Sequence, residues 1–240
     1  MIVKVEPLPP RTPWSDFPRV VIHAPEVDVK KHPSYAAAKA GDAGSAFSLV
    51  ADTLSEEAVQ EIVAVVGDRS PFLVSAHAYE RNGVNAIPEA LASELSERTG
   101  FEVDSSIVQT NIVGHTGANG FARMARQAAF DGEVVAGADY WLVDDFIGQG
   151  GTLANLRGFL ESKGGHVIGA TALTGKPHSA KLAPTAERIA ALRAKHGNEL
   201  EVWWKTRFGH DFDCLTESEA RYLEQTADAD TVRNRIAEAE

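Results

Sequence analysis

The segment from Tyr140 to Leu153, YWLVDDFIGQGGTL, constrains the fold of this chain more than any other. It begins with four aromatic and aliphatic residues, which are typical of a buried strand in an α/β sheet. Asp144 and Asp145 follow this run, and a turn with three glycines comes next. Apolar residues then recur at helical spacing from Leu153 onward. The segment therefore predicts a strand, a loop and the N-terminus of a helix.

Such a junction favours the binding of an anion. Backbone N–H groups and the positive end of the helix, about half an elementary charge, point at the loop. The glycines let the backbone approach a ligand closely, and Thr152 adds a hydroxyl donor. Two aspartates would repel a phosphate unless the ligand also offers hydroxyl donors or brings a divalent cation. A sugar phosphate meets both conditions, with its phosphate on the glycine loop and its diol on the carboxylates.

This pattern resembles the phosphoribosyl pyrophosphate (PRPP) signature of the type I phosphoribosyltransferases. In that family an apolar strand leads to two acidic residues, about three variable residues and a Thr-Gly-Gly-Thr-like turn. Asp144-Asp145 matches the acidic pair, and Gly150-Gly151-Thr152 matches the end of the motif. Gly148 and Gln149 stand where the family usually carries hydroxyl residues, so two donors to the 5′-phosphate are changed. The resemblance implies that the 5′-phosphate is bound by Gly148, Gln149, Gly150, Gly151 and Thr152. An α/β turn with incidental acids is the alternative.

Two other phosphate-binding motifs fit this segment poorly. A Walker A loop requires a lysine after its last glycine, and none follows Gly151. A dinucleotide-binding fingerprint places its glycines first and an acidic residue about 20 positions later, whereas here the acids precede the glycines.

Composition limits the possible class of protein. The 240 residues are 44% hydrophobic and 24% charged, as in an ordinary soluble globular protein with a sizeable core. The net charge of −11 argues against a nucleic-acid-binding surface. One cysteine, Cys214, excludes an intrachain disulfide and a multi-cysteine zinc site. The N-terminus lacks the pattern of a signal peptide, and no run of 18 apolar residues occurs, so we expect a cytoplasmic protein without a membrane segment.

A second strand and loop precede the glycine segment. Residues 71–77, PFLVSAH, predict another central strand, and a helix with apolar residues at four-residue spacing follows the loop at 78–85. The family resemblance implies that this loop wraps a pyrophosphate. Arg81, Asn82 and Gly83 would then supply a cation, an amide and a close-approaching backbone. An ordinary surface turn at Asn82-Gly83 is the alternative.

Residues 99–139 form a polar, glycine-bearing region that resembles the family's hood loop over the reaction centre. We expect a strand at 106–113 and a helix at 120–129. Arg123 and Arg126 share one face of that helix and would reach a pyrophosphate. His115 is the candidate base because it is the one side chain of this loop that titrates near neutral pH. No lysine lies between Arg98 and Lys163, so the loop lysine of orotate phosphoribosyltransferases is absent.

The rest of the chain predicts one further strand of the sheet and two regions that flank the core. Residues 166–173 predict a strand parallel to 140–143, because a helix joins the two. Lys176 follows that strand, where it would touch the acceptor or remain a solvated loop lysine. Residues 1–54 read as a proline-rich arm and a helical segment, and 55–181 as the core. Residues 182–240 read as a mainly helical extension with an edge strand at 201–208.

Two groups of charged residues lie outside the predicted core. His32, Lys39 and Asp42 would either line a site or be solvated helix residues and caps. The sequence GHDFD places His210 near Asp211 and Asp213, which suits a metal or, more simply, a turn. We therefore predict no metal centre formed by the protein alone.

The resemblance implies an α/β fold with an open, mostly parallel sheet and helices on both faces. It implies a pentosyltransferase that joins PRPP to a nucleobase or similar nitrogen acceptor and releases pyrophosphate, with Mg²⁺ carried by PRPP. Asp144 and Asp145 would face the developing sugar cation, and His115 would be the further catalytic candidate. The alternatives are a PRPP- or nucleotide-binding sensor of the same fold and a hydrolase-like relative. The expected partners are small molecules and a second copy of the chain, as the family often forms dimers.

Overall fold

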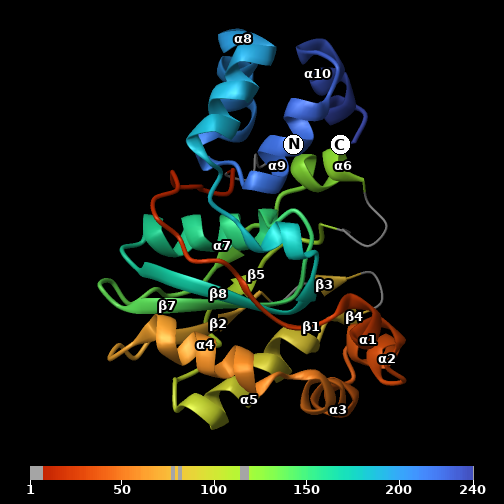
Figure 1. Cartoon of the computed structure of the whole chain (residues 1–240), viewed down its shortest axis with the longest axis vertical. Coiled ribbons are helices and arrows are strands. Elements are labelled where there is room, and N and C mark those ends of the chain that lie inside the picture. Colours follow the sequence, from red (N-terminus) through yellow and green to blue (C-terminus); the bar gives the residue numbers. More distant parts are fainter. Residues whose placement is uncertain (1–7, 77–78, 81–82, 114–118, 240) are drawn as a thin grey trace, which may run out of the picture.

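The computed structural model describes residues 8–76, 79–80, 83–113 and 119–239. A four-stranded sheet with strand order β1-β8-β7-β2 lies at its centre, and all three pairings are parallel (Figure 1). The α/β prediction with an open parallel sheet is therefore confirmed. The strands of this sheet are β1 Val21–Ala24, β2 Phe72–Ser75, β7 Asp139–Ile147 and β8 His166–Gly175.

Helices cover both faces of this sheet (Figure 1). Successive residues of a strand point to opposite faces, and β7 follows this rule. Trp141 and Val143 are buried in a core with the helices that precede β5, whereas Tyr140 and Leu142 are buried in a core with α7, Gly151–Ser162. The helices on the first face are α1 Glu26–Lys31, α2 Tyr35–Lys39, α3 Ala43–Thr53, α4 Glu56–Val66 and α5 Ile87–Thr99.

Local signals fix several helix boundaries. Ser55 caps α4, since its side chain accepts a hydrogen bond from the N–H of Ala58. Asp42 caps α3 in the same way. Gly100 ends α5 in the left-handed conformation, with φ of 75°, which favours glycine. Among the described residues no helix combines the length and apolarity needed to cross a membrane.

The predicted hood region contains less regular structure than the sequence suggested. The strand expected at 106–113 is reduced to β5, Val108–Gln109, which pairs with β6, Phe130–Asp131. The helix expected at 120–129 is α6, Gly120–Ala125. A further small ladder joins β3, Tyr79–Glu80, to β4, Gly83–Val84.

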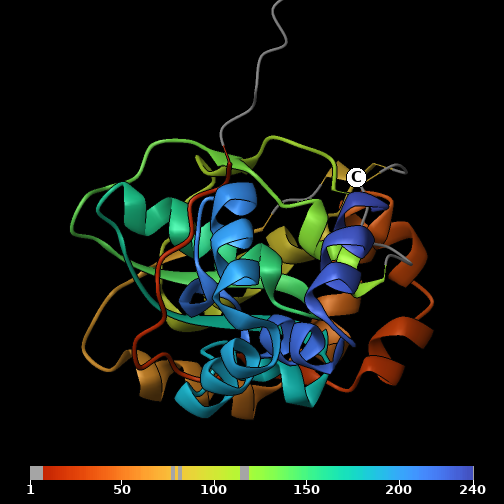
Figure 2. The same cartoon turned by 90° about the horizontal axis from the view of Figure 1, so that it is seen from above.

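The C-terminal segment forms a helical unit with its own core. Seen from above, its helices, drawn in blue, lie over the middle of the molecule (Figure 2). Phe121 and Met124 of α6 belong to this core too, so the unit includes a helix from the predicted hood. The other members are α8 Ala186–Phe208, α9 Glu217–Gln225 and α10 Ala229–Ala237, with short 3₁₀ turns at Pro177–Ala180 and Phe212–Cys214.

The predicted edge strand at 201–208 is wrong, because this segment is the second half of α8. Leu200, Trp204 and Phe208 recur every four residues and are all buried in the C-terminal core. That spacing matches one face of a helix, and it outweighs the strand preference of the two tryptophans. Gly197, with φ of 72°, interrupts α8 before this second half begins.

The N-terminal arm is extended and packs against α7. Residues 8–20 form neither helix nor strand. The guanidinium of Arg157 lies 4.4 Å from the ring centre of Trp14 and donates to the carbonyl of Thr12 at 3.1 Å. The arm, drawn as a red tube in Figure 1, runs between the C-terminal helices and the start of β1.

Candidate functional site

The candidate site lies at the carboxyl end of β7, where open α/β sheets bind ligands. Asp144 and Asp145 lie inside β7, not after it, because β7 pairs with β8 as far as Ile147. Within the strand the two side chains alternate. Leu142 and Val143, which precede them, belong to the cores on opposite faces of the sheet. The two carboxyl groups nevertheless interact with each other, and both are close enough to Lys39 to interact with its charge.

The two aspartates have different electrostatic environments. Asp145 forms an ion pair with Lys39 of α2, at 3.0 Å between Oδ2 and Nζ. Asp144 accepts the N–H of Asp145 at 2.8 Å. Burial, followed by the charge of Asp145, raises the pKa of Asp144 well above its ordinary value. Lys39 thus neutralises one carboxylate, and the environment of the other favours its protonated form.

The glycine loop leads into α7 as the sequence predicted. Gly150 adopts φ of 81°, in the left-handed region, and α7 begins at Gly151 without an acidic residue in its first turn. The guanidinium of Arg123 lies against Gly148, so closely that a Cβ at this position would clash with Nη1. Burial lowers the pKa of Arg123. A partly desolvated cation from α6 therefore stands beside the loop.

Side chains of the C-terminal unit cover one side of the loop. The hydroxyl of Thr216 donates to the carbonyl of Gln149 at 2.6 Å. A Cβ at Gly151 would lie 2.8 Å from Oε1 of Glu219, which is itself buried and ion-paired with Arg11 at 2.6 Å. The other side remains partly exposed at Gly148, Gln149, Gly151 and Thr152.

One polar atom of the loop lacks a partner. The Oε1 atom of Gln149 is buried, and no residue in the described part of the chain donates a hydrogen bond to it. Buried acceptors in folded proteins are usually satisfied, so this atom is an exception within the loop.

The remaining predicted site residues are dispersed. Lys176 follows β8 and forms an ion pair with Glu26 at 2.5 Å. Arg126 donates to the carbonyl of Ala239 at 3.0 Å, and Gly83 lies in β4. The predictions for Arg81, Asn82 and His115 concern residues outside the described ranges.

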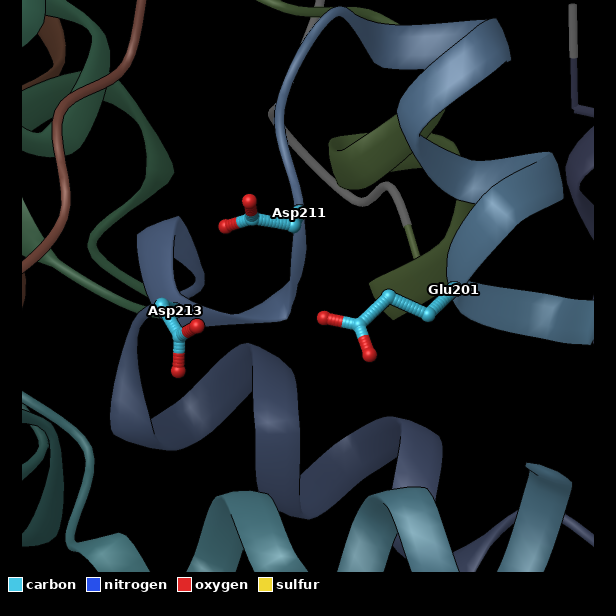
Figure 3. A group of neighbouring side chains, drawn as sticks. All are labelled: Glu201, Asp211 and Asp213. Carbon is cyan, nitrogen blue, oxygen red and sulfur yellow. The ribbon is translucent and has the colours of Figure 1, made fainter. Parts of the chain in front are cut away.

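Figure 3 shows the acidic group formed by Glu201 of α8 with Asp211 and Asp213 of the following segment. Arg193 already binds this group, with Nη2 at 2.7 Å from oxygens of both Glu201 and Asp213. His210 is buried apart from it and hydrogen-bonds through Nδ1 to the carbonyl of Asp211 at 3.0 Å. The group is therefore an ion-pair network that ties the turn to α8.

A hollow of about 410 Å³ lies at the opposite, amino end of the sheet. Arg69 and Arg157 line it, but both bind backbone carbonyls of the fold. Both guanidinium groups that line this hollow are therefore engaged by the fold itself.

The sequence left two interpretations open for Lys39, a residue that lines a site or a solvated helix residue. It did not indicate that α9 contacts the glycine loop. Nothing in the local pattern around Thr216 or Glu219 points to a loop that lies 67 residues earlier in the chain. Thr216 and Glu219 form a capping box at the start of α9, and both of its hydrogen bonds are present.

Comparison with known proteins gives two curated relatives. Protein TraN of Escherichia coli is 39% identical over 229 residues, which cover 95% of this chain and 51% of the relative. An uncharacterized protein of Haemophilus influenzae is 39% identical over 151 residues, 62% of this chain and 34% of the relative. The chain thus spans about half the length of the first relative and about a third of the second. No family model matches the chain.

These findings overturn the phosphoribosyltransferase prediction. The relative that aligns with 95% of the chain bears the name TraN, not that of a phosphoribosyltransferase, and no phosphoribosyltransferase model matches. The prediction of a pentosyltransferase that uses PRPP is therefore wrong, as is that of a PRPP sensor of the same family. The structure adds that α9 covers part of the loop, since Glu219 lies against Gly151 and Thr216 donates to the carbonyl of Gln149. The motif arises here from a strand, glycine loop and helix that other α/β proteins share.

Proposed function

We propose that this chain is a binding domain for a small anion, held at the carboxyl end of β7 between the glycine loop and Arg123. The observation that carries the proposal is the position of the Arg123 guanidinium against Gly148. The cation stands beside the N-terminus of α7, whose first-turn N–H groups favour negative charge. Charge from two separate helices therefore favours the same ligand.

The neighbouring aspartates do not oppose this ligand as strongly as the sequence suggests. Asp145 is neutralised by Lys39, and the raised pKa of Asp144 favours a proton on that carboxyl. Repulsion of an anion is reduced accordingly.

Mg²⁺ carried by the anion is the second part of the proposal. Carboxylate and phosphate oxygens are ligands that Mg²⁺ prefers, and it keeps part of its water shell. The ion would have to displace Lys39 from Asp145 or a proton from Asp144. We therefore expect Mg²⁺ to strengthen binding, and to do so more as pH rises.

The alignment with Protein TraN supports a proposal about the role of the chain. Because the chain aligns with about half of Protein TraN, we propose that it acts as one binding module of a TraN-like protein. This role requires no transfer reaction.

Calorimetry with inorganic phosphate, pyrophosphate and sulfate, with and without Mg²⁺, tests the proposal. We expect a dissociation constant on the order of 1 mM or tighter for at least one anion, and a loss of about tenfold in Arg123→Met. Arg235→Met removes an exposed guanidinium on α10 and serves as the charge-matched control. Absence of binding by the unmodified chain at about tenfold higher anion concentration overturns the proposal.

A further inference from the structure

Helix α9 touches both parts of the proposed anion site. Three of its residues, at a spacing of three, lie on one face of the helix: Thr216 at the N-cap, Glu219 and Tyr222. Thr216 hydrogen-bonds to Gln149, and Glu219 packs against Gly151. Tyr222 contacts α6 instead. One helix face thus connects the glycine loop with the helix that carries Arg123.

The contact between Tyr222 and α6 leaves no space for even a methyl group. A Cβ at Gly120 would lie 2.5 Å from Cζ of Tyr222, and real Cβ atoms do not approach so closely. The same ring meets Phe121 edge to face, with centroids 5.0 Å apart. Glycine at the first position of α6 therefore lets the tyrosine ring fix where this helix begins.

The start of α6 determines the place of Arg123. Asn119 caps the helix through the N–H of Ala122, and Arg123 is one turn beyond Gly120. Because α6 has six residues, a displacement at its first turn moves the guanidinium as well. The buried Arg11–Glu219 ion pair holds α9 in turn against α7.

We propose that α9 positions the two halves of the anion site, with Tyr222 as the positioning residue for Arg123 and Thr216 as that for Gln149. This inference rests on the proposed anion-binding function. Tyr222 acts through the place of α6 and requires no contact of its own with the ligand. The distance between the Arg123 guanidinium and the glycine loop therefore depends on contacts that one face of α9 makes.

A double-mutant cycle on phosphate affinity separates positioning from a general structural role. Tyr222→Ala is expected to weaken phosphate binding about tenfold in the unmodified background, and to have little further effect when Arg123 is already methionine. Tyr222→Phe retains the ring and should restore the affinity. Gln225→Ala, on an exposed position of α9, is the control. Equal losses from Tyr222→Ala with and without Arg123 would overturn the inference.

Hydrogen exchange of the backbone amides tests positioning without any ligand. We expect faster exchange in residues 119–126 for Tyr222→Ala and in residues 147–153 for Thr216→Val. Exchange in β8 and in residues 139–146 of β7 should be unchanged. Gly120→Ala, which leaves the tyrosine in place and displaces α6, should reproduce the first effect. If phosphate does not bind but these exchange changes occur, the proposed function fails and the positioning role of α9 stands. If phosphate binds and none of the three variants changes exchange, the positioning role fails alone.

Discussion

Arg11 of the N-terminal arm and Glu219 of α9 form an ion pair although 208 residues separate them in the sequence. The pair is bidentate, with contacts of 2.6 and 3.0 Å, and each side chain is only 2% exposed. Arg11 also donates to Asn155 of α7 at 2.6 Å. Burial alone would raise the pKa of Glu219, but Arg11 and the N–H of Thr216 outweigh burial and lower it. The arm, α7 and the C-terminal helices therefore meet at one desolvated charge pair.

Removal of one partner of this pair should be costly. Glu219→Gln keeps the shape of the side chain and leaves the Arg11 guanidinium buried without a counter-charge. We expect a loss of about 3–5 kcal/mol in the free energy of unfolding, measured by urea denaturation. The double variant Arg11→Met with Glu219→Leu should lose much less, because no charge remains unpaired. A single variant as stable as the unmodified chain would contradict this account.

Two buried histidines should make the protein less stable in acid. Burial is the main cause that lowers the pKa of His23 and of His210 to about 4. The unfolded chain binds a proton at each site near the ordinary pKa of about 6.5, whereas the native state resists protonation until about pH 4. Stability is therefore present above pH 6.5 and is lost as pH falls between these values, by roughly 3 kcal/mol for each histidine.

Urea unfolding at a series of pH values checks this expectation. His210→Gln should have a shallower loss of stability between about pH 6.5 and 4 than the unmodified chain. His166→Gln replaces a side chain that is 67% exposed and is the control. Parallel curves for His210→Gln and the unmodified chain would show that His210 does not remain neutral in the native state.

Gly158 of α7 should tolerate no side chain, because the arm crosses the helix there. A Cβ at this position would clash with the carbonyl of Pro10 and lie 2.7 Å from Cα of Arg11. Gly158→Ala is expected to lose roughly 1–3 kcal/mol by forcing the arm away. Gly44→Ala in α3 is the matched control, since its Cβ would meet only Oδ1 of Asp42 at 3.7 Å. That control should gain about 0.5 kcal/mol through reduced entropy of the unfolded chain, as measured by urea denaturation.

The parts of the fold that sequence reasoning predicted are those with a strong local pattern. The apolar run at 140–143 predicted β7, and the helix that follows it predicted a parallel partner, which is β8. The caps at Ser55 and Thr216 are local in the same sense, because each residue caps its helix with its own side chain. The end of β7 was less accessible, because its last residues are set by pairing with β8. Asp144 and Asp145 were therefore expected in a loop.

The parts that escaped prediction depend on contacts between distant segments. The second half of α8 contains two adjacent tryptophans that favour a strand locally, and only burial of Trp204 in the C-terminal core reveals the helix. The cover that α9 provides to the glycine loop depends on Thr216 and Glu219, far from that loop in sequence. A motif of a few residues could not exclude such cover. The motif was consequently assigned to the wrong family, and its location at the end of β7 as a ligand site stays a prediction.

Asp144 should lower the free energy of unfolding at pH values above the ordinary pKa of a carboxyl group. Its pKa is raised in the native state, chiefly by burial, so the native state holds a proton that the unfolded chain releases at the ordinary carboxyl pKa of about 4. The contribution of this group to stability is therefore most favourable below that pH and declines as pH rises toward the native pKa.

Asp144→Asn removes the ionisation and can still accept the N–H of Asp145. We expect the variant to become progressively more stable than the unmodified chain above about pH 4, by up to about 1.4 kcal/mol for each pH unit. Urea unfolding at several pH values measures this gap, with Asp145→Asn, which loses its Lys39 partner, as the comparison. A gap that does not change with pH would mean that Asp144 is ionised in the native state, and the reduced repulsion on which the proposed anion site relies would be absent.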